Sequence, residues 1–141
     1  MADAGERALV ALVRERVRPA PAWVAVGPGD DAAVVAPERN ALEVLTTDAL
    51  VEGVHFDRAF VPPDAIGHRA LAVNLSDLAA MGAAPRSALL SLVLPPGLPL
   101  ADFTAILDGF DALARAHGVA LLGGNITRSP GPLVIDVTAI G

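Results

Sequence analysis

The chain has 141 residues and a net charge of −6, with ten arginines and neither lysine nor cysteine. This length is typical of a single domain. Without cysteine there is no disulfide framework, thiolate nucleophile or thiolate metal site. The acidic balance and an aromatic content of 4% argue against nucleic-acid binding. Because a P-loop needs a lysine, phosphate recognition would have to use arginine, backbone N–H groups or divalent cations.

The sequence also argues against a membrane location. It holds no run of 18 apolar residues that could span a bilayer. Acidic residues stand near the N-terminus, where a secretory signal would carry positive charge. We therefore expect a cytoplasmic protein, and the lack of cysteine suits a reducing compartment.

The first part of the chain predicts a helix followed by a hairpin. Apolar residues recur at helical spacing from Asp3 to about Arg18, and Asp3 with Glu6 resembles a capping box. Two short β-type runs follow, at 32–36 and 41–48, and the four residues between them predict a hairpin turn. Residues 49–61 read as a loop.

The second part alternates helices and strands. A helix is predicted from residues 62–64 to Gly82, where prolines suit the first turn, and another from Pro99 to His117. Strands are predicted at 86–95, 119–124 and 133–141. The order favours an α+β domain, in which helices cover one face of a mixed sheet. The chain ends in or just after a strand-like run, which is compatible with a piece of a longer protein.

A carboxylate on the helix predicted around residues 65–82 is a first candidate ligand. Helical winding places Asp77 on an apolar face with Ile66 and Ala70, and Asn74 lies one turn earlier. A carboxylate in such a place needs a hydrogen-bond partner, a counter-charge or a metal. From this segment alone, a metal ligand and a buried loop cap explain Asp77 equally well.

Two further acidic clusters precede the helix. Asp30 follows a Gly-Pro-Gly turn, and by itself a solvated β-turn explains this segment better than a ligand site. Thr46, Thr47 and Asp48 end an apolar strand, where their oxygens suit the hard cation Mg²⁺. A strand-terminating turn is the alternative for this second cluster.

The remaining candidates are a glycine pair and a histidine. Gly124 lies in the segment GGNITRS, in which backbone N–H groups, Asn125 and Arg128 could meet a phosphate. An ordinary hairpin loop explains that segment better when it is considered alone. His55 follows the acidic strand end and either contacts an anion or caps its loop. Taken together, the clusters indicate a phosphate-binding site that uses several metal ions and few basic side chains.

At these residues the chain resembles the thiamine-monophosphate kinase family. The segments that carry the resemblance stand in the family's order, at 29–35, 46–56, 72–85 and 123–129. The first and last would also fit the wider group of aminoimidazole ribonucleotide synthase, selenophosphate synthetase and the hydrogenase-maturation dehydratase. Because members are longer, the resemblance implies that residues 1–141 are one N-terminal ATP- and Mg²⁺-binding domain, without the family's C-terminal domain.

The resemblance implies transfer of a phosphoryl group from ATP to thiamine phosphate, giving ADP and thiamine diphosphate. The attacking oxygen already belongs to a phosphate whose second ionisation lies near pH 6, so no protein base is required. The reaction needs alignment of two anionic ligands and neutralisation of charge, for which several Mg²⁺ ions would serve. We expect the isolated domain to be inactive.

The resemblance also assigns residues to roles. The implied Mg²⁺ ligands, direct or through water, are Asp30, Thr46, Thr47, Asp48, Asp77 and Asn125. The implied nucleotide contacts are Gly124, Asn125 and Arg128, and His55 is the implied contact to thiamine phosphate. Many relatives have Asp where this chain has Asn125, which keeps an oxygen ligand but loses a charge.

The family fold is a mixed sheet with helices on one face, and two N-terminal domains pair their sheets into a dimer barrel. The resemblance therefore implies a homodimer formed through the sheet. Two alternatives stay open from the sequence. The protein could be another ATP-dependent enzyme of the same wider group, or the chain as it stands could be a non-catalytic dimerisation module.

Overall fold

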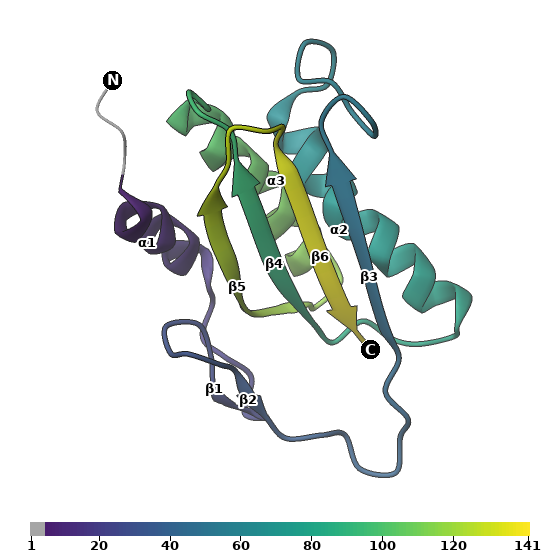
Figure 1. The fold of residues 1–141 in the computed structure, drawn as a ribbon. Coiled ribbons are helices and arrows are strands. Elements are labelled where there is room, and N and C mark those ends of the chain that lie inside the picture. The colour runs from purple at the N-terminus through teal and green to yellow at the C-terminus, as the bar shows by residue number, and fades with distance from the viewer. Residues whose placement is uncertain (1–4) are drawn as a thin grey trace.

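The computed structural model describes residues 5–141, so the predicted cap at Asp3 lies outside the described residues. Its helices and strands follow one another along the chain as drawn in Figure 1. They are α1 (Glu6–Arg16), β1 (Val24–Val26), β2 (Val34–Val35), β3 (Leu45–Val51), α2 (Pro63–Ala80), β4 (Ser87–Leu94), α3 (Leu100–Ala116), β5 (Ala120–Arg128) and β6 (Val134–Ile140). Within the described residues, no helix has both the length and the apolar character that a bilayer crossing requires.

The main sheet has the strand order β3-β6-β4-β5. Strands β4 and β5 are parallel, whereas β6 pairs antiparallel with both β3 and β4. The parallel pair is joined through α3, as a parallel connection requires a crossover. Helices α2 and α3 lie together behind one face of this sheet (Figure 1). The predicted α+β class and the one-sided helical cover are confirmed.

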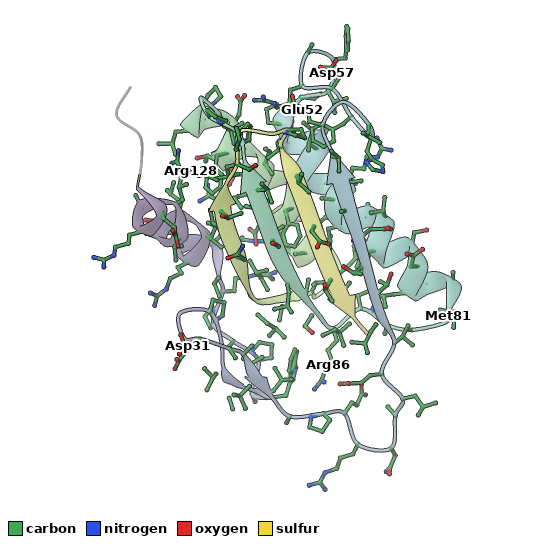
Figure 2. The ribbon with its side chains drawn as sticks, in the orientation of Figure 1. Asp31, Glu52, Asp57, Met81, Arg86 and Arg128 are labelled. Carbon is green, nitrogen blue, oxygen red and sulfur yellow. The ribbon has the colours of Figure 1, made fainter. Side chains whose placement is uncertain are left out.

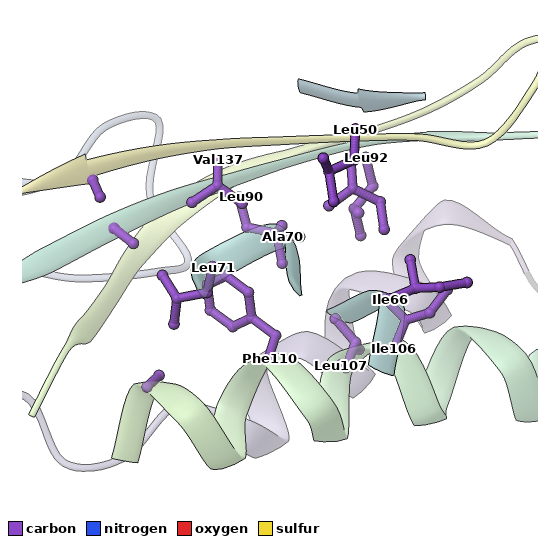
Figure 3. Close-up of a cluster of buried hydrophobic side chains, with 14 of the residues drawn as sticks. Leu50, Ile66, Ala70, Leu71, Leu90, Leu92, Ile106, Leu107, Phe110 and Val137 are labelled. Atoms are coloured by element: carbon purple, nitrogen blue, oxygen red, sulfur yellow. The ribbon is translucent and has the colours of Figure 1, made fainter. Parts of the chain in front are cut away.

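The core lies between the sheet and these two helices (Figure 3). On α3, Phe103, Ile106 and Phe110 are buried at spacings of three and four residues, which places them on one helical face. On β6, Ile135 and Val137 alternate with less buried residues and point to the same layer. Burying each such side chain contributes about 1.5–3 kcal/mol, so this layer holds the fold together.

Two glycines set the distance between α2 and α3. A Cβ atom on Gly67 of α2 would overlap the backbone carbonyl of Ile106 on α3. A Cβ atom on Gly109 of α3 would in turn overlap the carbonyl of Asp64 on α2. The two helix backbones therefore touch at a crossing that only glycine at both positions permits.

The predicted hairpin between residues 32–36 and 41–48 is wrong. Strand β2 pairs with β1 in a separate two-stranded sheet, while β3 pairs with β6. The expectation failed because β1 is only three residues long and has no readable alternation. The segment predicted as a loop at 49–61 also starts too early, because β3 extends through Val51.

The small β1–β2 sheet is attached to the main sheet through Arg86, just before β4. The Arg86 guanidinium stacks over Trp23, 4.0 Å from the ring centroid. Its Nη2 also donates to the carbonyl oxygen of Ala36, at 2.8 Å. Figure 2 shows Arg86 below the main sheet, on the side where the hairpin lies. One side chain therefore holds both ends of the hairpin.

Candidate functional site

Two of the predicted ligands meet where β3 begins. The Thr46 hydroxyl donates a hydrogen bond to Oδ2 of Asp77, which lies in the last part of α2, at 3.0 Å. Strand alternation turns Thr46, Asp48 and the buried Leu50 toward the helical layer. Asp48 and Asp77 are both exposed, so their carboxylates are open to solvent beside this edge strand. These residues are the nearest approach to a predicted cation site.

The prediction that Asp77 lies on a buried apolar face is wrong. The buried polar residue of α2 is Asn74, whose exposed fraction is 0%. Its Nδ2 donates to the carbonyl oxygen of Ala70 at 3.0 Å, and its Oδ1 has no hydrogen-bond partner. Helical winding placed both residues near the apolar face but could not show where that face ends. Asp77 lies beyond its edge, next to β3.

Thr47 lies on a different face of the sheet from Thr46 and Asp48, because successive side chains of a strand alternate. It points to the opposite, helix-free face of the sheet, where its hydroxyl donates to Oδ1 of Asp136 at 3.1 Å. Thr138 donates to the Thr47 hydroxyl oxygen, also at 3.1 Å. Asp136 is not among the residues predicted from the sequence. Its signal was two polar residues, at 136 and 138, spaced by two within an otherwise apolar strand.

The prediction of a phosphate-binding turn at Gly124 and Asn125 is wrong in its local geometry. Both residues lie within β5, where Gly124 pairs with Leu90 and Asn125 with Ser91. A Cβ atom on Gly124 would overlap the carbonyl oxygen of Leu90, so close packing of two strands explains this glycine. Three strand spacings separate β5 from β3, which is about 14 Å. Asn125 is therefore not beside Asp48.

Asp30 occupies a third place, the exposed turn of the β1–β2 hairpin. Its Oδ1 accepts a hydrogen bond from the backbone N–H of the next residue, Asp31, at 2.9 Å. Figure 2 shows Asp31 at the lower left, away from Met81 at the end of α2. Arg128 ends β5 near the upper end of the sheet (Figure 2).

His55 lies beyond the far end of β3 from Thr46. Val51 is five residue steps along the strand from Thr46, which corresponds to about 17 Å. Figure 2 places Glu52 and Asp57, which flank His55 in the chain, at the upper end of the sheet. Phe56 next to it is buried, as expected for an apolar anchor of this loop. The implied substrate contact and the Thr46–Asp77 pair are thus at opposite ends of one strand.

Residues 29–141 match the family described as AIR synthase related protein, N-terminal domain. The chain belongs to this family. The match contains every site residue that the sequence predicted, from Asp30 to Arg128.

Among curated proteins, this AIR synthase related domain is similar to thiamine-monophosphate kinases. The one from Synechococcus elongatus is 46% identical over 113 residues, which cover 80% of this chain and 34% of the relative. The chain therefore spans about a third of that relative's length. The resemblance recognised in the sequence is confirmed at this level.

Solved structures of thiamine-monophosphate kinases are also similar to this domain. Thiamine-monophosphate kinase from Stenotrophomonas maltophilia K279a is 44% identical with a TM-score of 0.75, covering 99% of this chain and 42% of that one. A complex of AaThiL with AMPPCP and TMP is 33% identical with a TM-score of 0.70, covering 100% of this chain and 43% of that one. The domain thus has the fold of these enzymes' matched part.

The donor set of the domain fits Mg²⁺ only in part. Carboxylate and hydroxyl oxygens at Asp77, Asp48 and Thr46 are the ligands that this hard cation prefers. Among residues 5–141, however, no three His, Cys, Asp or Glu side chains lie together as a metal cluster. Mg²⁺ commonly takes one or two carboxylates and completes its shell with water and substrate phosphate. The exposed Asp77 edge suits that mode of binding.

A separate cavity of about 310 Å³ has two main walls. Helix α1 and the segment that follows it form one wall, and α3 and β5 form the other. Its walls are mainly apolar and include Val13, Val17, Val24, Leu107, Phe110 and Leu121. None of the predicted site residues lines it. The predicted phosphate chemistry therefore lies on exposed strand edges and loops rather than in this cavity.

Proposed function

We propose that this chain is the nucleotide- and metal-binding domain of a thiamine-phosphate kinase, which converts ATP and thiamine phosphate into ADP and thiamine diphosphate. The observation that carries the proposal is the similarity over the whole chain to AaThiL, which was solved with AMPPCP, an ATP analogue, and TMP. The order of the four acidic and glycine-containing segments supports it. The C-terminal part of the longer relatives would supply the remaining contacts, and the location would be cytoplasmic.

The proposed chemistry asks little of the protein beyond positioning. The acceptor is a phosphate oxygen that is already largely ionised, so no side chain needs to remove a proton. Asp77, Asp48 and Thr46 would hold Mg²⁺ directly or through water, and Thr47, Asp30 and Asn125 would complete the metal positions as the resemblance implies. When bound, Mg²⁺ neutralises charge on the transferring phosphoryl group. Gly124, Asn125 and Arg128 would bind the nucleotide, and His55 the thiamine phosphate.

A chimera tests the activity. Residues 1–141 replace the matching part of the Synechococcus elongatus relative, and formation of thiamine diphosphate is followed with ATP and Mg²⁺. We expect product that requires both substrates and the metal. Absence of product from a folded chimera would contradict the proposal. Product from an aminoimidazole precursor or from selenide instead would favour another ATP-dependent enzyme of the wider group.

We also propose that two copies pair through the helix-free face of the main sheet. This face carries Leu89, which is 37% exposed, and Leu45, which is 65% exposed, together with the partly buried Val93 and Ile140. These apolar side chains lie beside the polar group of Thr47, Asp136 and Thr138, and such a mixture of apolar and polar residues is typical of a protein interface. Thr47 and Asn125 point to this face, so pairing would place them at the interface between the two copies.

Light scattering on the 141-residue chain tests the pairing. We expect a dimer, and we expect Leu89→Glu to give a monomer. Leu100→Glu is the matched control, because Leu100 is 42% exposed but lies on α3, away from this face. A monomeric parent chain would contradict the pairing. A dimer that shows no heat change on titration with Mg²⁺ and AMPPCP would support a non-catalytic dimerisation module.

A further inference from the structure

The cavity beside α1 is larger than a packing void. Its volume of about 310 Å³ corresponds to about ten water molecules, whereas voids in close-packed protein interiors are rarely larger than one. This volume lies at the lower end of the range for small-molecule pockets, which starts at about 300 Å³. Figure 1 shows α1 beside β5, the edge strand of the main sheet. The cavity therefore lies where a peripheral helix meets the free edge of the sheet.

The wall on the core side consists of residues that are held by other contacts. Leu107 and Phe110 of α3 are 2% and 3% exposed, because their remaining surfaces are packed in the core. Ala114, one turn further along α3, has a small side chain, and Gly118, which follows the helix, has none. A close-packed core has low compressibility, so this wall does not move in to fill the space.

The opposite wall is apolar and only loosely packed. Within the described residues, Leu9 is the only buried residue of α1. Val13 and Val17 line the cavity and stay half-buried. The wall continues through Pro19 and Pro21, which have no backbone N–H and restrict the chain to an extended course. This side of the cavity therefore offers apolar surface and few hydrogen-bond donors.

The charged side chains around the cavity leave one positive charge without a partner. Nε of Arg16 donates to Oδ1 of Asp108 at 2.7 Å, which balances that pair. Asp111 is balanced in the same way by Nε of Arg115, also at 2.7 Å. Arg18 lines the cavity as well, and no carboxylate among residues 5–141 forms an ion pair with it. The cavity thus combines an apolar interior with an unpaired guanidinium.

We propose that this cavity binds a small amphipathic anion, with an apolar body of about ten non-hydrogen atoms inside and a carboxylate against Arg18. The volume sets the size of the ligand, and the apolar walls select its body. Arg18 selects the head group, because the guanidinium matches the geometry of a carboxylate. None of the residues assigned to phosphoryl transfer lines the cavity, so this proposal does not depend on the kinase function.

Calorimetric titration of the 141-residue chain with octanoate tests the binding. Octanoate has the required size and a single carboxylate, and octanamide is its neutral match. We expect saturable binding of octanoate with a Kd of about 0.1–1 mM, as is usual for so small a ligand. Octanamide should bind about fivefold more weakly, because it lacks the charge that Arg18 attracts. Absence of saturable octanoate binding would overturn the proposal, and equal binding of both compounds would exclude the anionic head group.

Variants that fill the cavity test where the ligand binds. Ala114→Leu should weaken octanoate binding at least about tenfold, because the added carbon atoms occupy the space of the ligand. Val13→Phe fills the cavity from the half-buried wall and should have the same effect even if the core does not accept the first change. Ala112→Leu is the matched control, since Ala112 is exposed on α3 and does not line the cavity. Parent-like binding by a folded Val13→Phe variant would exclude this cavity.

NMR of the backbone amides locates the ligand in the parent chain. We expect octanoate to shift the amide signals of Val17 and Leu121, which line the cavity on opposite sides. The helix-free face of the main sheet also carries exposed apolar side chains, among them Leu89. Shifts centred on Leu89 with none at Val17 would show that octanoate binds that face, and would overturn the proposal.

The role of Arg18 is tested by removing its charge. We expect Arg18→Gln to weaken octanoate binding about fivefold, to the level of octanamide, and to leave octanamide binding unchanged. Arg7→Gln is the matched control, because Arg7 is an exposed arginine at the start of α1 and does not line the cavity. If Arg18→Gln bound octanoate as tightly as Arg7→Gln does, Arg18 would not be the partner of the head group.

Discussion

The hydroxyl of Thr46 donates to the carboxylate of Asp77 across the boundary between β3 and α2, with 3.0 Å between Oγ1 and Oδ2. The two residues are 31 positions apart in the chain and belong to two different candidate motifs. The hydrogen bond engages Oδ2 of Asp77, and the residue as a whole is exposed. This contact brings residues of two candidate motifs together.

The first prediction concerns this pair in the chimeric kinase. Asp77→Asn should lower turnover roughly 100-fold or more, because an amide is a poor substitute for a carboxylate ligand. Thr46→Val should have a smaller effect, about tenfold, and raise the Mg²⁺ concentration needed for half-maximal rate, because it keeps the Asp77 carboxylate but removes a neutral proposed ligand and the donor that orients Asp77. Steady-state rates measured over a Mg²⁺ titration would show both effects.

Two variants control for this experiment. Thr46→Ser keeps the hydroxyl and should retain the parent's Mg²⁺ dependence. Asp108→Asn removes an exposed carboxylate of α3 that pairs with Arg16, and such surface pairs contribute only about 0–1 kcal/mol. If Asp77→Asn needed no more Mg²⁺ than Asp108→Asn does, Asp77 would not be a metal ligand.

The fold was largely predictable from local patterns, and the failures have a common cause. Helices α2 and α3 carry long stretches with apolar periodicity, and both were predicted within a few residues of their ends. The failed hairpin at residues 32–48 depended on which strands pair, which is a long-range property. Strand β3 pairs with β6, more than 80 positions later in the chain, because their inward residues complete the same core layer.

The candidate site was less predictable because its residues depend on orientation rather than on type. The segment from Thr46 to Asp48 was correctly placed at a strand, but alternation sends Thr47 to the opposite face. Helical winding suggested that Asp77 was buried, although Asn74 is the residue that is. Asp136 was overlooked because a single acid in an apolar strand carries no motif. The metal roles of these residues stay predictions.

The second prediction concerns the buried Asn74. Its Oδ1 has no partner, and an unsatisfied buried polar group costs about 1–3 kcal/mol. Asn74→Leu, which fills a similar volume with apolar atoms, should therefore raise the free energy of unfolding by about 1 kcal/mol. Asn74→Ala should lower it by about 1–3 kcal/mol, because it leaves a cavity against Leu71 and Leu78. Urea denaturation of the 141-residue chain measures both changes.

A destabilised Asn74→Leu would show that Oδ1 has a partner in solution, such as a buried water. The comparison with Asn74→Ala then separates the two explanations. If Asn74→Leu and Asn74→Ala lose the same free energy of unfolding, the amide group of Asn74 stabilises the fold and the cavity left by alanine adds no further loss. If only the alanine variant is destabilised, packing volume decides the stability at this position.

The third prediction concerns the contact of α2 with α3. Gly67→Ala should lower the free energy of unfolding by about 3 kcal/mol or more, because its Cβ would overlap the carbonyl of Ile106 and the helices would have to separate. Gly5→Ala is the matched control, since no atom lies within 4 Å of a Cβ there and its φ is −59°. A similar midpoint of thermal unfolding for both variants would contradict the close crossing.

The fourth prediction concerns the link between Arg86 and Trp23, the only tryptophan in the chain. Arg86→Leu removes both the guanidinium over the indole and the hydrogen bond to Ala36, so the hairpin that carries Asp30 loses its attachment. We expect a red shift of tryptophan emission and a loss of about 1–2 kcal/mol in the free energy of unfolding, the sum of an exposed cation–π contact and one hydrogen bond.

Two further variants control for this experiment. Arg86→Lys keeps the cation but not the flat stacked group, so its emission and its stability should lie between those of the parent and those of Arg86→Leu. Arg39→Leu, in the exposed segment after β2, controls for the loss of charge. Emission from Arg86→Leu identical to that of the parent would show that Trp23 is held by other contacts.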